Sequence, residues 1–343
     1  MNDIVVTGSA AISAAGVGVQ ALVEGVREGR SLLTPAPEEI AGPGGLWGKA
    51  EKFRAADFIP PLKARKFDRC SLLAVVATGL ALADAGIAKG SFPSERVGIT
   101  LGCGFGGIAN SEEFLSGYFR GGVDALAPML FPNTVANAAA SNASIEHSLQ
   151  GPNVTMVQRL CSAEAAFDLA CRFIAEGRAD VMITGGVDEI TPRTMQAFRQ
   201  MGQLRRMPHG FAEGCGLLVL ESAQHAARRG AAVRGSVEGI STLGMLVPGR
   251  EDEGAERLLR GALPADAVSL SGSADLWEDV RKLLPSPRVE LQRITGRALA
   301  MGGLSMAALL GLLAEGEKGL HVAASPEGPY FAVTFRGGAG ARH

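Results

Sequence analysis

The fold of this chain is decided by two stretches, VTMVQRLCSAEAAFDLACRFIAEG at residues 154–177 and VELQRITGRALAMGGLSMAALLGLLAEG at residues 289–316. Each begins with a strand-like run, continues with Gln-Arg and a small-residue turn, and ends in an Ala- and Leu-rich segment that closes in Ala-Glu-Gly. A further strand-like run precedes each stretch, VGITLG at residues 97–102 and VSLSGS at residues 268–273. The pattern predicts two copies of one α/β unit, with chance similarity between buried strand–helix units as the alternative.

Short β-branched runs that end in glycine recur along the chain, at residues 4–8, 97–102 and 181–186. Such runs are typical of buried strands that end in tight turns. Ala- and Leu-rich segments lie between them, for example at residues 71–85 and 163–175. The alternation predicts an α/β protein. The helical segments of the repeat are rich in small residues, which suits helices that have sheets packed on both sides.

Composition and charge exclude several classes of protein. The 343 residues are 47% hydrophobic and 20% charged, which excludes a disordered chain. The 33 basic and 35 acidic residues leave a net charge of −2, so no overall field would attract a nucleic acid or an anionic membrane. The five cysteines include no paired CxxC spacing, which argues against a disulfide framework and a structural metal site. We expect reduced thiols and a cytoplasmic location.

Two apolar runs call for a test against membrane segments. Residues 4–23 carry no charge, but they include several polar residues and glycines and follow Asp3 rather than a basic region. Residues 298–314 are uncharged but number only 17, and a span needs about 20 apolar residues. We therefore expect neither a signal peptide nor a membrane span, and a fully buried helix at residues 298–314.

Cys161 lies where a predicted strand turns into a predicted helix. Its thiol would lie at a helix N-terminus, where free backbone N–H groups lower a thiol pKa and can stabilise an oxyanion. The alternative is inert packing, because free cysteine is among the most buried residue types. The other four cysteines are interpreted as packing residues.

Residues 102–107, Gly-Cys-Gly-Phe-Gly-Gly, form a GxGxxG pattern after a strand and offer a rival hypothesis. The pattern can hold a dinucleotide pyrophosphate. That fingerprint should open the first strand–helix unit and be followed by a ribose-binding acid, whereas this one starts about a hundred residues into the chain. A nicotinamide or flavin enzyme is therefore the weaker alternative.

Further motifs follow in order: DIVVTGSAAISAAG at residues 3–16, ERVGITLGCGFGG at 95–107, FPNTVANAAASNASIEHSLQGPNVTM at 131–156, ADVMITGGVDE at 179–189 and GFAEGCGLLVLESAQHAARRGA at 210–231. With them the chain resembles, nearly end to end, a β-ketoacyl-acyl-carrier-protein synthase (ketosynthase) of the thiolase superfamily. The resemblance implies a thiolase-like duplicated fold layered αβαβα, with an N-terminal half at residues 1–230 and a C-terminal half at residues 231–343. It also implies that Cys161 is an acyl-thioester nucleophile, because RLCSAE occupies the position of the family's TACSSG motif.

The chain departs from the family at both catalytic histidines. Members use one histidine in an NAHGT motif and one in a KxxxGH motif to bind the malonyl thioester and promote decarboxylation. By the resemblance, Ser271 occupies the first histidine slot, Arg297 the second, and Gln292 the lysine slot. Serine cannot replace imidazole, and arginine stays protonated near neutral pH. Decarboxylative condensation is therefore expected to be impaired, although Arg297 could bind a carboxylate instead.

Other family landmarks are altered as well. The resemblance places the FGFGG gate loop at residues 334–338, with Phe335 and Arg336 at the gate. The loop expected opposite it, at residues 245–254, is short. His209 lies near a family aspartate position, but none of the five histidines coincides with a catalytic slot, and a role for His209 stays open.

A local basic cluster surrounds Arg65 and Lys66, which match the family's RKMD position. Family members dock an acidic acyl carrier protein through basic residues near the pocket mouth, so the resemblance implies docking here. A solvated face without function is the alternative. The implied substrate travels on the phosphopantetheine of the carrier protein, and no metal or other cofactor is expected.

Two hypotheses on function follow. In the first, Cys161 accepts or transfers an acyl group in fatty-acid or polyketide-type biosynthesis, which makes the chain an acyltransferase with impaired condensation. In the second, it is a non-catalytic subunit similar to the chain-length factors that pair with an active ketosynthase. The retained Cys161 favours the first and the lost histidines favour the second. A homodimer and a heterodimer both stay open.

Overall fold

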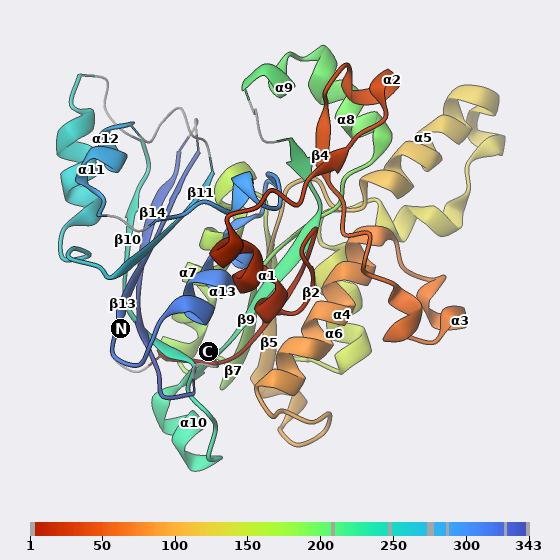
Figure 1. The fold of residues 1–343 in the computed structure, drawn as a ribbon. Helices are drawn as coiled ribbons and strands as arrows, with labels where there is room; N and C mark the ends of the chain where they lie inside the picture. Colours follow the sequence, from red (N-terminus) through yellow and green to blue (C-terminus); the bar gives the residue numbers. More distant parts are fainter. Residues whose placement is uncertain are drawn as a thin grey trace.

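The computed structural model describes residues 4–206, 210–245, 249–272, 278–285, 288–325 and 328–340 (Figure 1). The strands are β1 (Ile4–Ser13), β2 (Gly16–Val17), β3 (Thr34–Pro35), β4 (Leu46–Gly48), β5 (Val97–Cys103), β6 (Asn153–Met156), β7 (Val181–Asp188), β8 (Phe211–Ala212), β9 (Gly214–Ser222), β10 (Gly235–Leu243), β11 (Ala267–Gly272), β12 (Arg288–Val289), β13 (Lys318–Ala324) and β14 (Tyr330–Gly337). The helices are α1 (Val19–Glu28), α2 (Glu38–Ala41), α3 (Pro61–Ala64), α4 (Arg69–Asp84), α5 (Ile108–Gly121), α6 (Ala138–His147), α7 (Ser162–Ala175), α8 (Pro192–Gln200), α9 (Gln203–Arg206), α10 (Ala223–Arg228), α11 (Glu251–Leu259), α12 (Glu278–Leu283) and α13 (Gly302–Leu312).

One long sheet runs through the described residues in the order β12-β11-β13-β14-β10-β1-β9-β7-β5-β6. Strands β1 and β10 pair antiparallel at its centre. From β1 outward the pairings are antiparallel to β9 and β7, then parallel to β5 and β6. From β10 outward they are antiparallel to β14 and β13, then parallel to β11 and β12. The two sides repeat one pattern, which confirms the predicted duplication.

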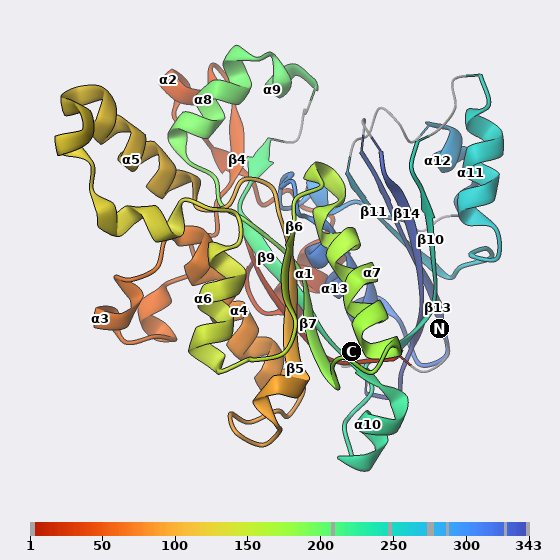
Figure 2. The ribbon, with the colours of Figure 1, turned by 180° about the vertical axis from the view of Figure 1, so that it is seen from behind.

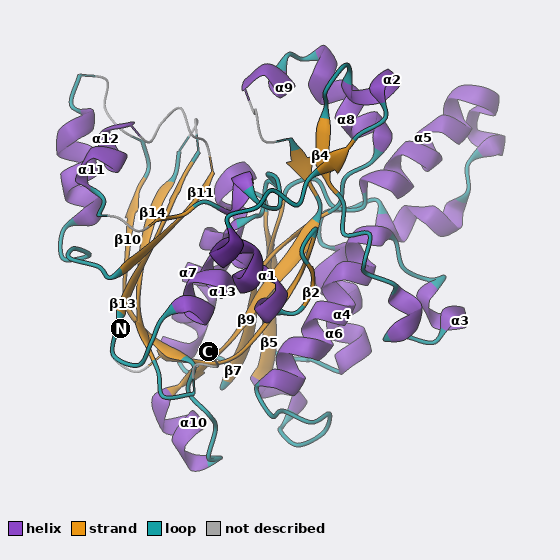
Figure 3. Ribbon diagram, viewed as in Figure 1, coloured by secondary structure: helices purple, strands orange, loops and turns teal. Residues whose placement is uncertain are grey.

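The helices form three layers around the two halves of the sheet (Figure 2). Helices α7 and α13 lie between the halves. Helix α7 packs mainly against β5 and β7, and α13 packs mainly against β9 and β11. Helices α4 and α6 cover the outer face of one half, and α11 and α12 cover that of the other, as Figure 3 also shows. The expected αβαβα layering is confirmed.

The small residues predicted for the central helices have a structural reason. Every residue of α13 from Gly302 to Leu310 is buried, since sheets lie on both sides of the helix. In α7, Phe167 reaches Phe335 of β14 edge to face, with ring centroids 5.6 Å apart. The buried helix expected at residues 298–314 is present as the shorter α13, which begins at Gly302 and ends at Leu312. Among the described residues, no helix is long and apolar enough to span a membrane.

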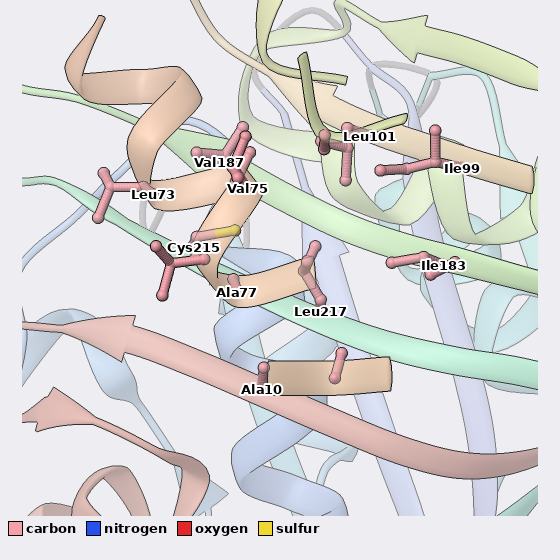
Figure 4. Packing of buried hydrophobic residues seen from close by; sticks show 14 of the residues in the cluster. Ala10, Leu73, Val75, Ala77, Ile99, Leu101, Ile183, Val187, Cys215 and Leu217 are labelled. Carbon is pink, nitrogen blue, oxygen red and sulfur yellow. The ribbon is translucent and has the colours of Figure 1, made fainter. Parts of the chain in front are cut away.

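The largest part of the core lies between α4 and the N-terminal half of the sheet. Helix α4 is capped by Asp68, whose side chain accepts a hydrogen bond from Ser71 N. Figure 4 shows aliphatic side chains of α4 against those of β1, β5, β7 and β9; the labelled residues are Ala10, Leu73, Val75, Ala77, Ile99, Leu101, Ile183, Val187, Cys215 and Leu217. All five cysteines are buried free thiols.

The two halves share a continuous sheet, so the division at residues 230 and 231 stays a prediction. It would fall in the connection between α10 and β10. A small second sheet, β3-β4-β8, stands beside the main one, and a parallel bridge links its Phe211 to Arg297, which lies outside the named strands.

Candidate active site around Cys161

Cys161 ends the short 3₁₀ helix Arg159–Cys161 and is the N-cap residue of α7. The predicted position at a strand-to-helix turn is thus confirmed. Arg159 adopts a positive φ of 48° in this turn, which is uncommon for a residue other than glycine. The thiol is fully buried, packs against Ala165, Ala323 and Phe331, and donates to Pro329 O at 3.2 Å.

The expected lowering of the Cys161 pKa is wrong. Burial raises the pKa of the thiol well above its usual range, and the negative charge of Glu164 raises it further. The helix N-terminus favours the thiolate, but its effect is limited because the backbone N–H of Cys161 already bonds Gln158 O at 3.1 Å. At neutral pH the residue is a thiol.

Glu164, Ser269, Ser271 and His321 form a buried polar cluster one turn of α7 away from Cys161. Ser271 Oγ donates to Glu164 Oε1 at 2.5 Å, and His321 Nε2 lies 2.9 Å from the same oxygen. His321 Nδ1 lies 2.8 Å from Ser269 Oγ. The imidazole of His321 bridges the two groups, because its Nε2 donates to the carboxylate of Glu164 and its Nδ1 contacts the hydroxyl of Ser269.

The pairing of β11 with β13 explains how this cluster forms. The strands run parallel, with Ser269 opposite His321 and Ser271 opposite Ala323. Alternate residues of a strand point to one face, so the two serines, His321 and Ala323 all face α7. Ala323 touches Cys161, and the polar side chains beside it meet Glu164.

Sequence reasoning missed Glu164, Ser269 and His321. The available signal was weak: polar residues alternate with apolar ones in VSLSG and GLHVA, and RLCSAE has Glu164 where the quoted family motif ends in glycine. No local pattern could show that these residues meet, because 157 positions separate Glu164 from His321.

The structure brings the three substituted slots together. Arg297 is buried, and its Nη2 donates to Gly272 O, next to Ser271, and to Gln292 Oε1 at 3.2 Å. Its backbone also holds the small sheet, since Ala212 N donates to Arg297 O at 2.8 Å. The guanidinium is therefore engaged by protein oxygens beside the slot that Ser271 fills.

The gate residues lie elsewhere than expected. Phe335 is a fully buried core residue of β14, and Arg336 pairs on the surface with Glu238 at 2.6 Å. Pro329, which directly precedes β14, is the residue that approaches Cys161 here, since its carbonyl oxygen accepts the hydrogen bond of the thiol. The letters Phe-Arg-Gly-Gly resemble the gate motif, but they belong to the far end of β14.

The short loop expected opposite the gate does face this corrected position. Strand β10 ends at Leu243, and the next residue, Gly244, packs closely against Gly328. A Cβ added to Gly328 would lie only 1.7 Å from Gly244 O. Gly328 also has a φ of 68°, so glycine is required there by both conformation and space. Residues 246–248 lie outside the described residues.

Close packing accounts for the GxGxxG pattern. A Cβ on Gly102 would lie 2.2 Å from the backbone of Ser162, and one on Gly107 would lie 2.0 Å from Asn133 O. These glycines let β5 and the start of α5 approach their neighbours, including the turn that carries Cys161. The dinucleotide hypothesis is not needed to explain them.

A cavity of about 300 Å³ lies beside Cys161, between α7 and the ends of β10 and β14. Its walls include Met156, Ala165, Leu243, Pro329 and Phe331. Cys161 does not line the cavity itself, but Pro329 accepts its hydrogen bond, and Ala165 and Phe331 belong to the same apolar cluster. The cavity is mostly apolar and reaches the surface of the chain.

The predicted docking residues lie on the segment between α3 and α4, which does not line this cavity. Arg65 and Lys66 are exposed between α3 and α4, and neighbouring Lys63 pairs with Glu146. His209 lies outside the described residues. Among the described residues, no group of histidine, cysteine and acidic side chains is arranged to hold a metal ion.

Comparisons with solved structures agree with this fold. The chain superposes with a TM-score of 0.83 and 20% identity on a structure of a type II polyketide synthase acyl-carrier protein in complex with its ketosynthase, covering 98% of this chain and 100% of that one. The ishigamide ketosynthase/chain length factor gives a TM-score of 0.83 at 23% identity, with 98% and 99% covered.

Comparisons of sequence identify the family. The family model "Beta-ketoacyl synthase, N-terminal domain" matches residues 1–226. The 3-oxoacyl-[acyl-carrier-protein] synthase 2 of Rhizobium meliloti (strain 1021) is 30% identical over 304 aligned positions, and the match covers 78% of this chain and 72% of that protein. The protein of the same name from Staphylococcus aureus (strain COL) is 27% identical over 284 aligned positions, and the match covers 76% of this chain and 68% of that protein. With these matches joined to the duplicated fold and the placement of Cys161, the chain belongs to the β-ketoacyl synthase family.

Proposed function

We propose that this chain serves acyl-chain building on a carrier protein as a non-condensing subunit that pairs with a catalytically complete ketosynthase. The state of Cys161 carries the proposal. Its thiol donates to Pro329 O, its backbone N–H bonds Gln158 O, and no histidine of the described part of the chain hydrogen-bonds to it. Condensation by this family's route needs a thiolate, free oxyanion donors and a group that cycles a proton.

The substituted slots support the same conclusion. The hydroxyl of Ser271 donates a hydrogen bond to Glu164. The first histidine slot therefore holds a group that neither accepts nor releases a proton near neutral pH. Arg297 fills the second slot with a permanently charged guanidinium that is bonded to Gly272 O and Gln292. Neither residue can replace an imidazole in decarboxylation.

Acyl acceptance on Cys161 is the second candidate. The cysteine is retained at the start of α7, and the adjoining cavity of about 300 Å³ could admit a thioester arm. Thiolate attack would require the bond to Pro329 O to break and the carboxylate of Glu164 to be tolerated nearby. The raised pKa of Cys161 opposes this step and places the candidate second.

A partner chain is supported by an exposed apolar arm, which we define as residues 108–135. It comprises α5 and two short 3₁₀ helices, and it stands away from the body of the molecule in Figures 1 and 2. Its exposed apolar side chains are Leu115, Tyr118, Phe119, Val123, Met129, Phe131 and Val135, with Phe119 79% and Met129 90% exposed. An apolar surface of this kind marks a protein interface. Strand β6 adds an open sheet edge.

Co-expression tests the pairing. With the ketosynthase encoded nearest to its own gene, the chain should purify as a 1:1 heterodimer, measured by mass photometry. Phe119→Glu on the apolar arm should abolish the complex, because burying an unpaired charge is costly. Leu283→Glu on α12, on the other side of the molecule, should leave it intact. A stable homodimer that condenses acyl chains without a partner would refute the proposal.

Docking of the carrier protein near Arg65 and Lys66 is part of this proposal, as are a phosphopantetheine-borne substrate and a cytoplasmic location. Reversal of both charges to glutamate should weaken binding of an acyl carrier protein about 3- to 30-fold and flatten its salt dependence, measured by isothermal titration at two ionic strengths. Reversal of the exposed Arg27 and Arg30 is the matched control and should change neither quantity. Equal weakening by both double variants would show a non-specific charge effect and remove the docking site.

A further inference from the structure

Glu164 stands where the quoted family motif ends in glycine, and its carboxylate is one of the most enclosed acidic groups in the described residues. Its side chain is 0% exposed. It lies in the first turn of α7, three positions after Cys161, and adjacent turns place such residues on one side of a helix. A glutamate at this position often turns back to the N-cap backbone. Here the N-cap backbone bonds Gln158, and the carboxylate points into the buried polar cluster.

The surroundings hold this carboxylate in one place. Ser271 and His321 both bond its Oε1, and Ser269 orients His321. The start of α13 packs directly on it, because a Cβ on Gly302 would lie 1.9 Å from Oε1. Glu164 cannot turn toward solvent without moving α13 or the β11–β13 pair.

The charge of Glu164 is incompletely neutralised. Its Oε2 is buried and has no hydrogen-bond partner among the described residues. In the described part of the chain the ion-pair contact of Glu164 is with His321 Nε2 at 2.9 Å, and no lysine or arginine side chain pairs with it. In an interior of low dielectric constant such a charge acts strongly on a neighbouring thiol.

We propose that Glu164 is a positioning residue whose buried carboxylate, one turn of α7 from Cys161, suppresses the reactivity of that cysteine, and that Ser269, Ser271 and His321 fix this carboxylate in place. The inference deepens the proposed function and rests on it, since it explains how a chain that keeps the family cysteine avoids acylation. It predicts that a neutral residue at position 164 makes Cys161 more reactive, while burial of the thiol continues to raise its pKa.

The two buried cysteines of α7 allow a paired test. Cys171 lies on the same helix, and burial together with the charge of Asp168 raises its pKa. In the chain labelled with ¹³Cβ-cysteine, Glu164→Gln should lower the NMR-detected pKa of Cys161 by about one unit or more and leave Cys171 unchanged. Asp168→Asn should do the reverse. At pH 8 the rate of iodoacetamide labelling, read by peptide mass, should rise about tenfold at Cys161 only.

A second variant guards against misfolding of Glu164→Gln. Glu164→Gly restores the residue of the family motif and should give the same shift. An unchanged Cys161 pKa in whichever variant keeps the wild-type circular dichroism would overturn the inference, as would an equal shift at Cys171. Because the titration uses the chain alone, it can fail while the partner-dependent function holds. Condensation of acyl chains by the isolated wild-type chain would instead refute the proposed function.

Discussion

Glu221→Ala should lower the free energy of unfolding by about 3–5 kcal/mol, the largest loss of stability that we expect from one substitution. Glu221 is fully buried at the end of β9. It accepts hydrogen bonds from Thr7 Oγ1, His225 Nδ1 at 2.6 Å, and Arg229 Nε at 2.8 Å. Removal of the carboxylate leaves the guanidinium of Arg229, whose side chain is only 13% exposed, without its partner. This largely buried, unpaired charge accounts for most of the lost stability. Urea unfolding followed by circular dichroism measures the change.

Glu238→Ala is the matched control. Glu238 pairs with Arg336 at a similar distance of 2.6 Å, but both side chains reach solvent, so its loss should cost less than about 1 kcal/mol. Burial raises the pKa of Glu221, but the hydrogen bonds from Arg229, Thr7 and His225 outweigh burial and lower it. Its contribution is therefore present above the unfolded pKa and is lost as the pH falls through the lower folded pKa. Equal losses in the two variants would contradict the account of this buried pair.

The fold was predictable because it depends on local patterns that occur twice. Gln-Arg followed by a small-residue turn and an Ala-rich helix, at residues 154–177 and 289–316, needed only periodicity to be seen. The strand order around β1 and β10 confirmed it. The position of Cys161 at the start of α7 followed from the same local pattern.

The electrostatics of the site could not be predicted from local patterns. The helix N-terminus favoured a lowered thiol pKa, but the outcome depends on burial and on Glu164, whose partners Ser271 and His321 come from the other half of the chain. Residue type alone fails here because a buried carboxylate is fixed by tertiary contacts.

The gate was misplaced for a related reason. A short Phe- and Gly-containing motif can match at two positions, and only strand pairing separates them. Tyr330 opposite Ala324 and Arg336 opposite Lys318 put residues 334–338 at the far end of β14 from Pro329. Glycine content at the turn between β13 and β14 was too low to resemble the family's loop.

The most direct test of the central claim is a condensation assay on the isolated chain. Malonyl and acyl carrier proteins are incubated with the chain, and β-ketoacyl product is measured by mass spectrometry. The 3-oxoacyl-[acyl-carrier-protein] synthase 2 of Rhizobium meliloti serves as the positive control. Loss of proton-cycling groups predicts a rate at least about 10²- to 10⁴-fold below that control, because general acid–base catalysis contributes this much.

Cys161→Ala completes the assay. Our account predicts that the variant and the wild-type chain give the same background rate, since Cys161 is a buried thiol that donates to Pro329 O. Condensation by the isolated wild-type chain at the rate of the positive control, abolished by Cys161→Ala, would contradict the account and make the chain a working ketosynthase.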